Sequence, residues 1–507
     1  MIKKLDPDDL RKSVDTPLFD GISKAAGERG VQCYVIGGWV RDLFLGRPSS
    51  DIDILVERDA PELAEDVRRI LHCKRPVVVF RRFGTAQLKW RGLEVEFVSA
   101  RRESYSQDSR KPHVTAGSII DDLKRRDFTI NTIAIALHPD KKGELLDYFD
   151  GLDDLEDKLI RTPLADADIT FSDDPLRMMR CIRFATQLGF HIDFDTFDAI
   201  ERNADRISIV SNERICDELQ KIIASPRPSV GFVDMQRGGL LQLILPELAT
   251  LDIRESRGGY THKNNFYHSL EVLDNIAAKS NNIWLRWAAL LHDIGKGPTK
   301  SWNPLAGWTF KNHNVVGARM VKTVFRRLRL PTDERMRYVV RLVELHMRPI
   351  SIAGEGVTDS AVRRLGAEAG EDIDDLMTLA EADITSRKAE RKEGFLENFQ
   401  AVRKRLSDIE EKDRLRYFRP PIDGSEIMEV FGLPPCPKVG KLKTAIKDAV
   451  LDGEVPNDHD IALKWLIDKA SQDGIYPVTP LPQAGPEKAN ASVNRETDAA
   501  KEEDKRD

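Results

Sequence analysis

Short apolar runs alternate with polar turns from Val31 to about Leu146. Five of these runs are rich in β-branched residues and bounded by Gly, Pro or charged residues, which is typical of strands: VQCYVI, DIDILV, PVVVF, AQLKW and LEVEFV. Between the second and third runs, ELAEDVRRILH repeats apolar residues every three or four positions and predicts a helix. The first part of the chain is therefore expected to form a mixed sheet with helices.

A helical pattern begins at about Leu152 and continues almost to the end of the chain. Apolar residues three and four apart recur in PLRMMRCIRFATQLGF and NERICDELQKIIA. Turn signals interrupt the helices at RESRGGYTHKNN, GKGPTKSWNPLAGW and FRPPIDG. We predict the fold class α+β, with an N-terminal mixed β-sheet head followed by mostly α-helical parts.

Composition narrows the class of protein. The chain has 507 residues, which is too long for a single hydrophobic core, so several domains are expected. No apolar run approaches the roughly 18 residues that span a bilayer, and MIKKLDPDDL lacks an apolar signal core, so we expect no membrane partner. Five separated cysteines without a CxxC pair indicate reduced thiols in a cytoplasmic protein. A net charge of -6 still permits a nucleic-acid partner, because the local placement of basic residues decides binding.

Two aspartates in DIDILV form the centre of a first candidate site. Asp51 and Asp53 are two positions apart, so they share one face of a strand at roughly 6 to 7 Å. With Glu94 or Glu96 from LEVEFV they could hold Mg²⁺ through oxygen ligands, and the ion would bridge the phosphates of a nucleotide. The alternative is a strand edge whose charges face water.

The glycines before this strand suit the same chemistry. Gly37 and Gly38 would let the backbone approach a phosphate without an intervening side chain. Arg41 would add a charge-assisted contact to a triphosphate.

GGWVRD followed by DIDILV resembles the nucleotidyltransferase motif of the class II tRNA nucleotidyltransferase (CCA-adding enzyme) and bacterial poly(A) polymerase family. FGTAQL and EFVSARRESY resemble later strands of the family's head domain, and this resemblance favours Glu96 as the third carboxylate. RRDFTINTIAI is close to a family element that binds sugar and phosphates, with Thr132 where Ala is usual. The resemblance implies that role for Arg126, Asp127 and Asn131.

The stretch SDDPLRMMRCIRF supplies a candidate for reading a base. Asp174, Arg177 and Arg180 are three apart and are expected on one helical face, where they could form an ordinary salt bridge or present an acceptor and donors to a base edge. The stretch resembles the family's EDxxR motif, with Asp173 in place of Glu. The resemblance implies that Asp174 and Arg177 select CTP or ATP and that Arg180 contacts the nucleotide. In NERICDEL, a further neck motif, Arg214 and Glu218 are expected to orient helices.

Histidines and aspartates with metal-ligand spacing occupy the middle of the chain. A single helical His is usually incidental, but a buried His-Asp pair beside WAALL is costly without a partner, and both groups bind divalent transition metals. The pattern resembles the HD phosphohydrolase superfamily. The resemblance implies that His268, His292, Asp293 and Asp383 are metal ligands. It also implies that His313 and His346 are the additional ligands found in the two-metal members of the superfamily. Mn²⁺, Ni²⁺, Fe²⁺ and Co²⁺ remain open, and Lys296 could contact a phosphate.

These patterns and resemblances together predict six segments. They are an N-terminal helical extension (1–30), a nucleotidyltransferase head (31–150), a helical neck and body for base recognition and RNA binding (151–260), an HD domain (261–390), a C-terminal helical tail (391–475) and a disordered end (476–507). In the tail, four lysines could meet tRNA phosphates or simply face solvent: Lys438, Lys441, Lys443 and Lys447.

The expected function is template-independent addition of CCA to the 3′ end of tRNA from CTP and ATP. The HD site is expected to hydrolyse 2′,3′-cyclic phosphates or phosphomonoesters, or to serve structure only. Poly(A) polymerase and a partial enzyme that adds only CC or only A share nearly every motif. A third possibility is a metal phosphohydrolase with a degenerate nucleotide-binding head. The partners implied are tRNA, CTP and ATP, and we expect no obligate protein partner.

Overall fold

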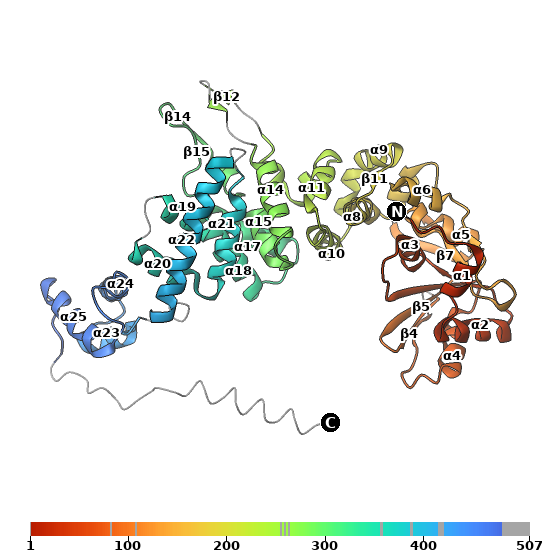
Figure 1. Cartoon of the computed structure of the whole chain (residues 1–507), viewed down its shortest axis with the longest axis horizontal. Helices are drawn as coiled ribbons and strands as arrows, with labels where there is room; N and C mark the ends of the chain where they lie inside the picture. The colour runs from red at the N-terminus through yellow and green to blue at the C-terminus, as the bar shows by residue number, and fades with distance from the viewer. Residues whose placement is uncertain are drawn as a thin grey trace. The chain divides into compact units, whose positions relative to one another are not determined.

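The computed structural model describes residues 2–81, 84–106, 109–253, 256–257, 260–261, 264–354, 358–385, 389–413 and 420–478 (Figure 1). The chain divides into two compact units. The first comprises Met1–Met347 with Thr378–Arg387, and the second Arg348–Met377 with Lys388–Asp507. Most of the segment 476–507, predicted to be disordered, lies outside the described residues.

A seven-stranded sheet forms the head, with the strand order β3-β4-β5-β2-β1-β8-β9. Its middle pair, β2 and β5, is parallel and its other pairs are antiparallel, which confirms the predicted mixed sheet. The strands are β1 (Cys33–Ile36), β2 (Asp51–Val56), β3 (Val78–Phe80), β4 (Thr85–Trp90), β5 (Leu93–Ser99), β8 (Ala134–Ala136) and β9 (Leu145–Leu146). The five runs predicted from the sequence are β1 to β5. A separate hairpin of β6 (Arg101–Ser106) and β7 (Ser109–Ala116) follows them.

Helices cover this sheet because each has one apolar side. The predicted helix is α4 (Ala60–Ile70), which buries Leu63, Ala64 and Val67 against β4 and β5. The other head helices are α1 (Pro7–Ser13), α2 (Pro17–Arg29), α3 (Gly38–Leu45) and α5 (Ile119–Lys124).

The rest of the first unit is largely helical, as predicted. Its helices are α6 (Gly151–Asp157), α7 (Ala167–Asp173), α8 (Leu176–Leu188), α9 (Phe194–Asn203), α10 (Asn212–Ile223), α11 (Pro228–Arg237), α12 (Leu240–Ile244), α13 (Pro246–Ala249), α14 (Asn265–Ala277), α15 (Ile283–Leu291), α16 (Lys296–Thr299), α17 (His313–Arg327) and α18 (Glu334–Leu345). Two-residue strands pair as β10 (Leu159–Ile160) with β11 (His191–Ile192) and β12 (Ser256–Arg257) with β13 (Tyr260–Thr261). The predicted turn at GKGPTKSWNPLAGW contains α16 and a hairpin of β14 (Ser301–Asn303) and β15 (Gly307–Thr309). The observed sheet and helices confirm the α+β class.

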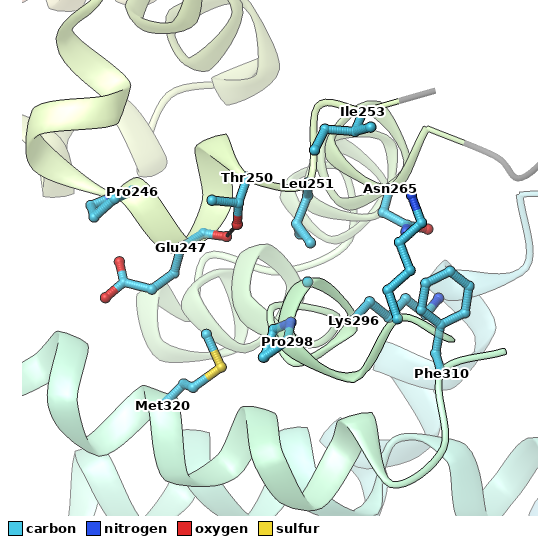
Figure 2. A pocket seen from close by; sticks show the side chains of 12 residues that line it. Pro246, Glu247, Thr250, Leu251, Ile253, Asn265, Lys296, Pro298, Phe310 and Met320 are labelled. Atoms are coloured by element: carbon cyan, nitrogen blue, oxygen red, sulfur yellow. Dashed lines mark hydrogen bonds between the residues drawn. The ribbon is translucent and has the colours of Figure 1, made fainter. Parts of the chain in front are cut away.

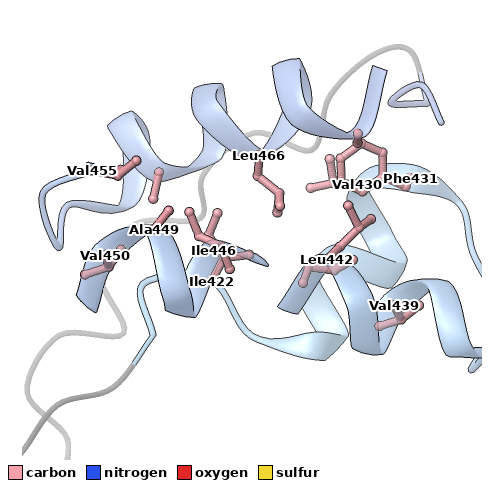
Figure 3. Close-up of a cluster of buried hydrophobic side chains, with 13 residues drawn as sticks. Ile422, Val430, Phe431, Val439, Leu442, Ile446, Ala449, Val450, Val455 and Leu466 are labelled. Atoms are coloured by element: carbon pink, nitrogen blue, oxygen red, sulfur yellow. The ribbon is translucent and has the colours of Figure 1, made fainter. Parts of the chain in front are cut away.

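Further helices complete the chain: α19 (Met347–Gly354), α20 (Asp359–Ala369), α21 (Ile373–Asp383), α22 (Ala389–Asp413), α23 (Gly424–Phe431), α24 (Pro437–Leu451) and α25 (His459–Gln472). The last three share an apolar core in which Leu466 of α25 points toward α24, where Leu442 and Ile446 are buried (Figure 3). Lys438, Lys441 and Lys443 of α24 are exposed. Among the helices in the described ranges, none combines the length and apolar character that crossing a bilayer requires.

Candidate active site and metal centre

The turn after β1 brings backbone N–H groups beside the predicted carboxylates. Gly37 precedes α3 with φ +71° and ψ -135°, a conformation that favours glycine. A Cβ atom at this position would lie 3.3 Å from Asp53 Oδ2 and 3.4 Å from Arg126 Nη1. Gly38 begins α3, whose first N–H groups have no partner within the helix. The first turn of α3, Asp53 and Arg126 therefore border the same small space.

Pairing of β2 with β5 places four carboxylates on one face. Asp53 is opposite Glu96 and Asp51 is opposite Glu94, while Ile52 is buried on the other face. Glu94 is ion-paired with Lys89, and Gln87 Nε2 donates to it at 3.4 Å. Glu96 faces Asp53, so the register supports Glu96 over Glu94 as the third carboxylate.

Electrostatics at this face favour a cation. Burial raises the pKa of the Asp53 carboxyl, and the Asp51 charge adds to the rise, although Arg126 and Arg180 oppose it. Burial, Asp53 and Asp51 likewise raise the pKa of Glu96. A divalent ion between these oxygens would relieve the repulsion, and hard oxygen ligands suit Mg²⁺. The three residues therefore fit the ion that the sequence predicts.

An internal network occupies several residues that were predicted to touch the nucleotide. Arg41 is buried; Nη1 donates to Asn131 Oδ1 at 2.9 Å and Nε donates to Asp42 Oδ1 at 2.9 Å. Asn131 Nδ2 donates to Asp127 Oδ1 at 3.0 Å, and Arg180 Nη2 donates to Asp127 Oδ2 at 2.6 Å. This chain of bonds ties α3, the 3₁₀ turn Thr129–Asn131 and α8 together. Arg41 and Asp127 thus bond within the protein, and their contacts with a nucleotide stay a prediction.

Replacing Asp127 with Asn is expected to weaken this network. Burial alone would raise the pKa of Asp127, but Arg180 and Asn131 hold it at about 2, below the ordinary value of about 3.9. Because the folded pKa is depressed, this stabilisation is present above about pH 4 and is lost as the pH falls toward 2. Arg180 is 35% exposed and therefore partly screened, so we expect a loss of about 1 to 2 kcal/mol at pH 7.

Chemical denaturation at a series of pH values measures this loss. The difference between the wild type and Asp127→Asn should shrink below about pH 4, whereas Asp153→Asn, at an exposed position, should leave the unfolding free energy unchanged. A difference that stays constant to pH 3 would contradict the assignment.

The predicted base-reading residues are not on one helical face. Asp174 ends α7 with extended backbone angles, and α8 starts only at Leu176, so the expected placement of Asp174 on the helix is wrong. Arg177 and Arg180 do lie on α8, three positions apart. Arg177 Nη2 donates to the carbonyl of Arg125 at 2.8 Å. Asp174 and Arg177 therefore come from consecutive elements at the junction of head and neck.

The contact that Arg214 makes was not predicted from the sequence. Its Nη2 donates to Asp174 Oδ2 at 3.0 Å, so it directly contacts the predicted base-reading carboxylate. Glu218, one turn later on α10, is buried and pairs with Arg183 of α8, which agrees with a helix-orienting role. The i, i+4 spacing of Arg214 and Glu218 was the signal that both lie on the same side of α10.

Helix ends bring the six predicted metal ligands together. α14, α15, α17 and α18 are neighbouring helices (Figure 1). Asn264 caps α14 by accepting from the N–H of Tyr267, and Asn282 caps α15 in the same way. His268 lies on α14, and His313 begins α17. His292 and Asp293 follow the last residue of α15, His346 follows the last residue of α18, and Asp383 ends α21.

The six side chains form two groups of three, each with its ligand atoms within 4.8 Å: His268, His292 and Asp383; Asp293, His313 and His346. Asp293 joins the groups, because Oδ2 lies 3.2 Å from His292 Nε2 and Oδ1 lies 3.4 Å from His313 Nε2. Asp383 Oδ1 lies 2.7 Å from His268 Nε2. The arrangement can hold two ions with Asp293 between them.

Each of the four imidazole rings is held in its orientation by a contact of its Nδ1 atom. His292, His313 and His346 place Nδ1 at 2.7 to 2.9 Å from the carbonyl three residues earlier, and Nδ1 of His268 lies 3.1 Å from Thr385 Oγ1. A carbonyl can only accept, so those three rings carry a proton on Nδ1, and Nε2 is the nitrogen that would bind a metal ion once it is unprotonated. The Nε2 atom of buried His292 faces the carboxylate of Asp293, whose Oδ2 lies 3.2 Å away.

Charge at this centre also fits a metal. Burial lowers the pKa of His268 and His313 and lowers that of His346 to about 4, so these ligands are neutral at pH 7. Burial also acts to lower the pKa of His292, but Asp293 raises it to about 10. A bound cation would replace this proton, as metal binding to imidazole requires. Lys296 Nζ lies 2.6 Å from Asp293 Oδ2, which places an ammonium group at the edge of the centre.

Comparison with known families matches three parts of the chain, and the bounds of the six predicted segments stay a prediction. Residues 33–161 match the Poly A polymerase head domain, 189–251 match the probable RNA and SrmB-binding site of polymerase A, and 265–388 match the HD domain. All of the predicted site residues lie in the head and HD matches except Asp174, Arg177 and Arg180, which fall between the first two.

Similar proteins extend over most of the chain. The A-adding tRNA nucleotidyltransferase of Deinococcus radiodurans is 33% identical over 66% of this chain and 76% of its own length. The CCA-adding enzyme of Bacillus velezensis is 30% identical over 89% of this chain and 96% of its own. The structure of the Thermotoga maritima CCA-adding enzyme with tRNA shares the fold, with a TM-score of 0.57 and 21% identity over 92% of this chain and 98% of that one. The chain therefore belongs to the tRNA nucleotidyltransferase family, with a poly(A) polymerase-type head and an HD domain.

Proposed function

We propose that this protein adds CCA to the 3′ end of tRNA, using CTP and ATP and no nucleic-acid template. The observation that carries the proposal is the carboxylate face of Asp51, Asp53 and Glu96 beside the first turn of α3. Similarity to CCA-adding enzymes over 89% of the chain supports CCA addition over poly(A) synthesis. A role in tRNA processing agrees with the predicted cytoplasmic location.

In the proposed reaction, the terminal ribose hydroxyl attacks the α-phosphate of the nucleotide. The new oxygen–phosphorus bond forms as the bond to the β-phosphate oxygen breaks, pyrophosphate leaves, and the hydroxyl proton passes to the carboxylate face. Mg²⁺ held by Asp51, Asp53 and Glu96 would neutralise charge on the phosphates and lower the pKa of the attacking hydroxyl. The N–H groups of α3 and the guanidinium of Arg126 would bind the triphosphate.

Base selection is assigned to Asp174 and Arg177. A carboxylate accepts from a base amino group and a guanidinium donates to ring nitrogens or carbonyls, so the two groups together can distinguish bases. Arg214, bonded to Asp174 Oδ2, would hold that carboxylate in position. Arg180 and Asn131 support the site through Asp127.

Products formed on truncated tRNA separate the candidate activities. The protein is incubated with tRNA lacking its last three nucleotides and supplied with CTP, ATP or both. We expect two cytidines with CTP alone and CCA with both nucleotides. Growth of a long tail with ATP alone would establish a poly(A) polymerase. Addition of A only to tRNA that already ends in CC would establish the activity named for the D. radiodurans relative.

Replacing Glu96 with Gln is expected to lower the rate of nucleotide transfer about 10- to 100-fold. The change removes one of the proposed Mg²⁺ ligands but preserves the side-chain volume, and each tenfold corresponds to about 1.4 kcal/mol of transition-state stabilisation. Glu94→Gln is the matched control, since Glu94 is two residues away on the same strand face but pairs with Lys89. Single-turnover rates measure the difference; an equal loss in both variants would reject Glu96 as the third ligand.

A second function is assigned to the histidine centre: hydrolysis of 2′,3′-cyclic phosphates or phosphomonoesters. Four imidazoles and two carboxylates in a buried site are suited to Mn²⁺, Ni²⁺, Fe²⁺ or Co²⁺. A bound metal would supply hydroxide at neutral pH. Purified protein saturated with Mn²⁺ or Ni²⁺ should hydrolyse such esters, and no activity with either metal would reject this function.

A further inference from the structure

A cavity of about 490 Å³ adjoins the histidine centre and shares residues with it (Figure 2). Lys296, in its wall, places Nζ 2.6 Å from Asp293 Oδ2. The carbonyl of Phe310, also in the wall, accepts from His313 Nδ1 at 2.9 Å. The cavity therefore belongs to that centre. The head has a buried group of its own that lies outside the proposed ligand set, the carboxylate of Asp122.

Asp122 lies on α5, and none of its side chain is exposed. Oδ1 accepts from Arg125 Nε at 2.9 Å and from Arg125 Nη2 at 2.5 Å. Oδ2 lies 3.6 Å from Arg126 Nη2. A capping box of Ser118 and Asp121 starts the helix, so the first turn of α5 is held by other side chains. The two oxygens of Asp122 thus face two different arginines.

Arg126 lies between Asp122 and the carboxylates proposed to hold Mg²⁺. A Cβ atom at Gly37 would lie 3.4 Å from Arg126 Nη1 and 3.3 Å from Asp53 Oδ2. The Arg126 side chain is 18% exposed, so its charge needs an anionic partner within the protein. Without a charge on Asp122, the carboxylates left to it are those of Asp53 and Glu96, on which its charge already acts. Arg126 would then compete with Mg²⁺ for the same oxygens.

Arg125 links Asp122 to the proposed base-reading pair. The carbonyl of Arg125 accepts from Arg177 Nη2 at 2.8 Å. Two bonds from the Arg125 side chain to Asp122 hold this part of the backbone in place. One buried carboxylate therefore supports the phosphate end of the site through Arg126 and the base end through Arg125.

We propose that Asp122 is a positioning residue for nucleotide transfer, which keeps the guanidinium of Arg126 available to the triphosphate and away from the oxygens that bind Mg²⁺. This role rests on the transfer reaction proposed above. Asp122 itself contacts neither the nucleotide nor the ion. Its charge balances Arg126 while the site is empty, and it keeps Arg126 oriented when phosphate oxygens become additional partners.

A Mg²⁺ titration of Asp122→Asn tests this role. The amide has the same shape and keeps an oxygen for Arg125, but its NH₂ group cannot accept from Arg126. Transfer from CTP to truncated tRNA should need about tenfold more Mg²⁺ for its half-maximal rate, because the unbalanced cation competes with the ion. The rate at saturating Mg²⁺ should stay within about twofold of the wild type. A lower rate with an unchanged Mg²⁺ midpoint would overturn the proposal, since damage to the fold acts at every Mg²⁺ concentration.

A second background shows whether the effect acts through Arg126. In Arg126→Gln the competing cation is gone, so adding Asp122→Asn should leave the Mg²⁺ midpoint unchanged. The same shift in both backgrounds would overturn the proposal. Asp140→Asn is the matched control, because it removes a head carboxylate that is 81% exposed, and it should keep the wild-type midpoint. An equal shift in this control would make loss of net charge the cause and reject the role of Asp122.

Calorimetry of CTP binding at a series of Mg²⁺ concentrations separates this role from the transfer function. Asp122→Asn should need about tenfold more Mg²⁺ to reach the wild-type affinity, and only while Arg126 is present. If the wild type extends no truncated tRNA but this shift is found, nucleotide transfer is rejected and the role of Asp122 stands. If the wild type adds CCA and the shift is absent, the role of Asp122 is rejected and the transfer function stands.

Discussion

Asp51→Ala is expected to lower the rate of nucleotide transfer to tRNA by about 10³-fold or more. Asp51 and Asp53 start β2 on the same face as Glu96, and removal of one aspartate leaves too few oxygens to hold an ion against the incoming triphosphate. Stabilisation by such an ion amounts to several kcal/mol, and each 1.36 kcal/mol is a factor of about ten in rate. Extension of truncated tRNA with CTP, followed on a denaturing gel, measures the loss.

Two controls make the result specific to the head. Asp140→Ala changes a carboxylate whose side chain is 81% exposed and should transfer nucleotides at the wild-type rate. Metal content and ester hydrolysis of Asp51→Ala should also match the wild type, since the histidine centre uses none of the head residues. If Asp51→Ala retained full transfer activity, the division of labour between the two sites would be wrong.

Asp293→Asn is expected to remove most of the divalent metal bound at the histidine centre and to lower ester hydrolysis by about 10³-fold. Its two oxygens face different ligand groups, so one substitution damages both positions. An amide binds cations less well than a carboxylate, and the six ligands are mostly buried, where lost charge is not replaced by water.

Metal analysis of the purified protein gives the result directly. His459→Ala is the matched control, because His459 pairs with Glu426 in the C-terminal helices, away from this centre in sequence and in a different compact unit. The control should keep the wild-type metal content. Nucleotide transfer by Asp293→Asn should be normal, and unchanged metal content in Asp293→Asn would contradict the assignment of Asp293 as a shared ligand.

The strands of the head were predictable from the sequence because apolar and polar residues alternate along them and the apolar ones are buried. In DIDILV the isoleucines are buried and the aspartates point the other way, so the pattern alone placed both carboxylates on one face. The pairing of Asp53 with Glu96 could not be predicted in this way, because it depends on the register between β2 and β5. The resemblance to a known family favoured Glu96, and the strand register supports the same residue.

The misplacement of Asp174 has a local cause. Asp174 precedes Pro175, and the residue before a proline is disfavoured in the helical region, so its extended backbone was indicated by the sequence. No feature of the sequence indicated the hydrogen-bond network around Asp127. Arg41 and Asn131 are 90 residues apart, and Asp127 and Arg180 are 53 apart, so both bonds exist only in the folded chain, and the second also requires the head to pack on α8.

The six candidate metal ligands were predicted from residue type and resemblance, whereas the contacts of their Nδ1 atoms were not. Backbone carbonyls hold the Nδ1 atoms of three histidines, and any sequence has carbonyls at those positions. The cavity beside the centre was also hidden, because its wall combines α13, α14, α16 and α17 with the segment after β15. Only the folded arrangement shows that Lys296 belongs to both.

The location of a metal ion at the carboxylate face tests the central claim most directly. Crystals grown with Mn²⁺ and a non-hydrolysable CTP analogue would give an anomalous signal at each bound ion. We predict a signal at coordination distance, about 2 Å, from oxygens of Asp51 and Asp53, with the α-phosphate of the analogue on its other side. A signal at the histidine centre together with a bound analogue and no ion between these aspartates would contradict the account.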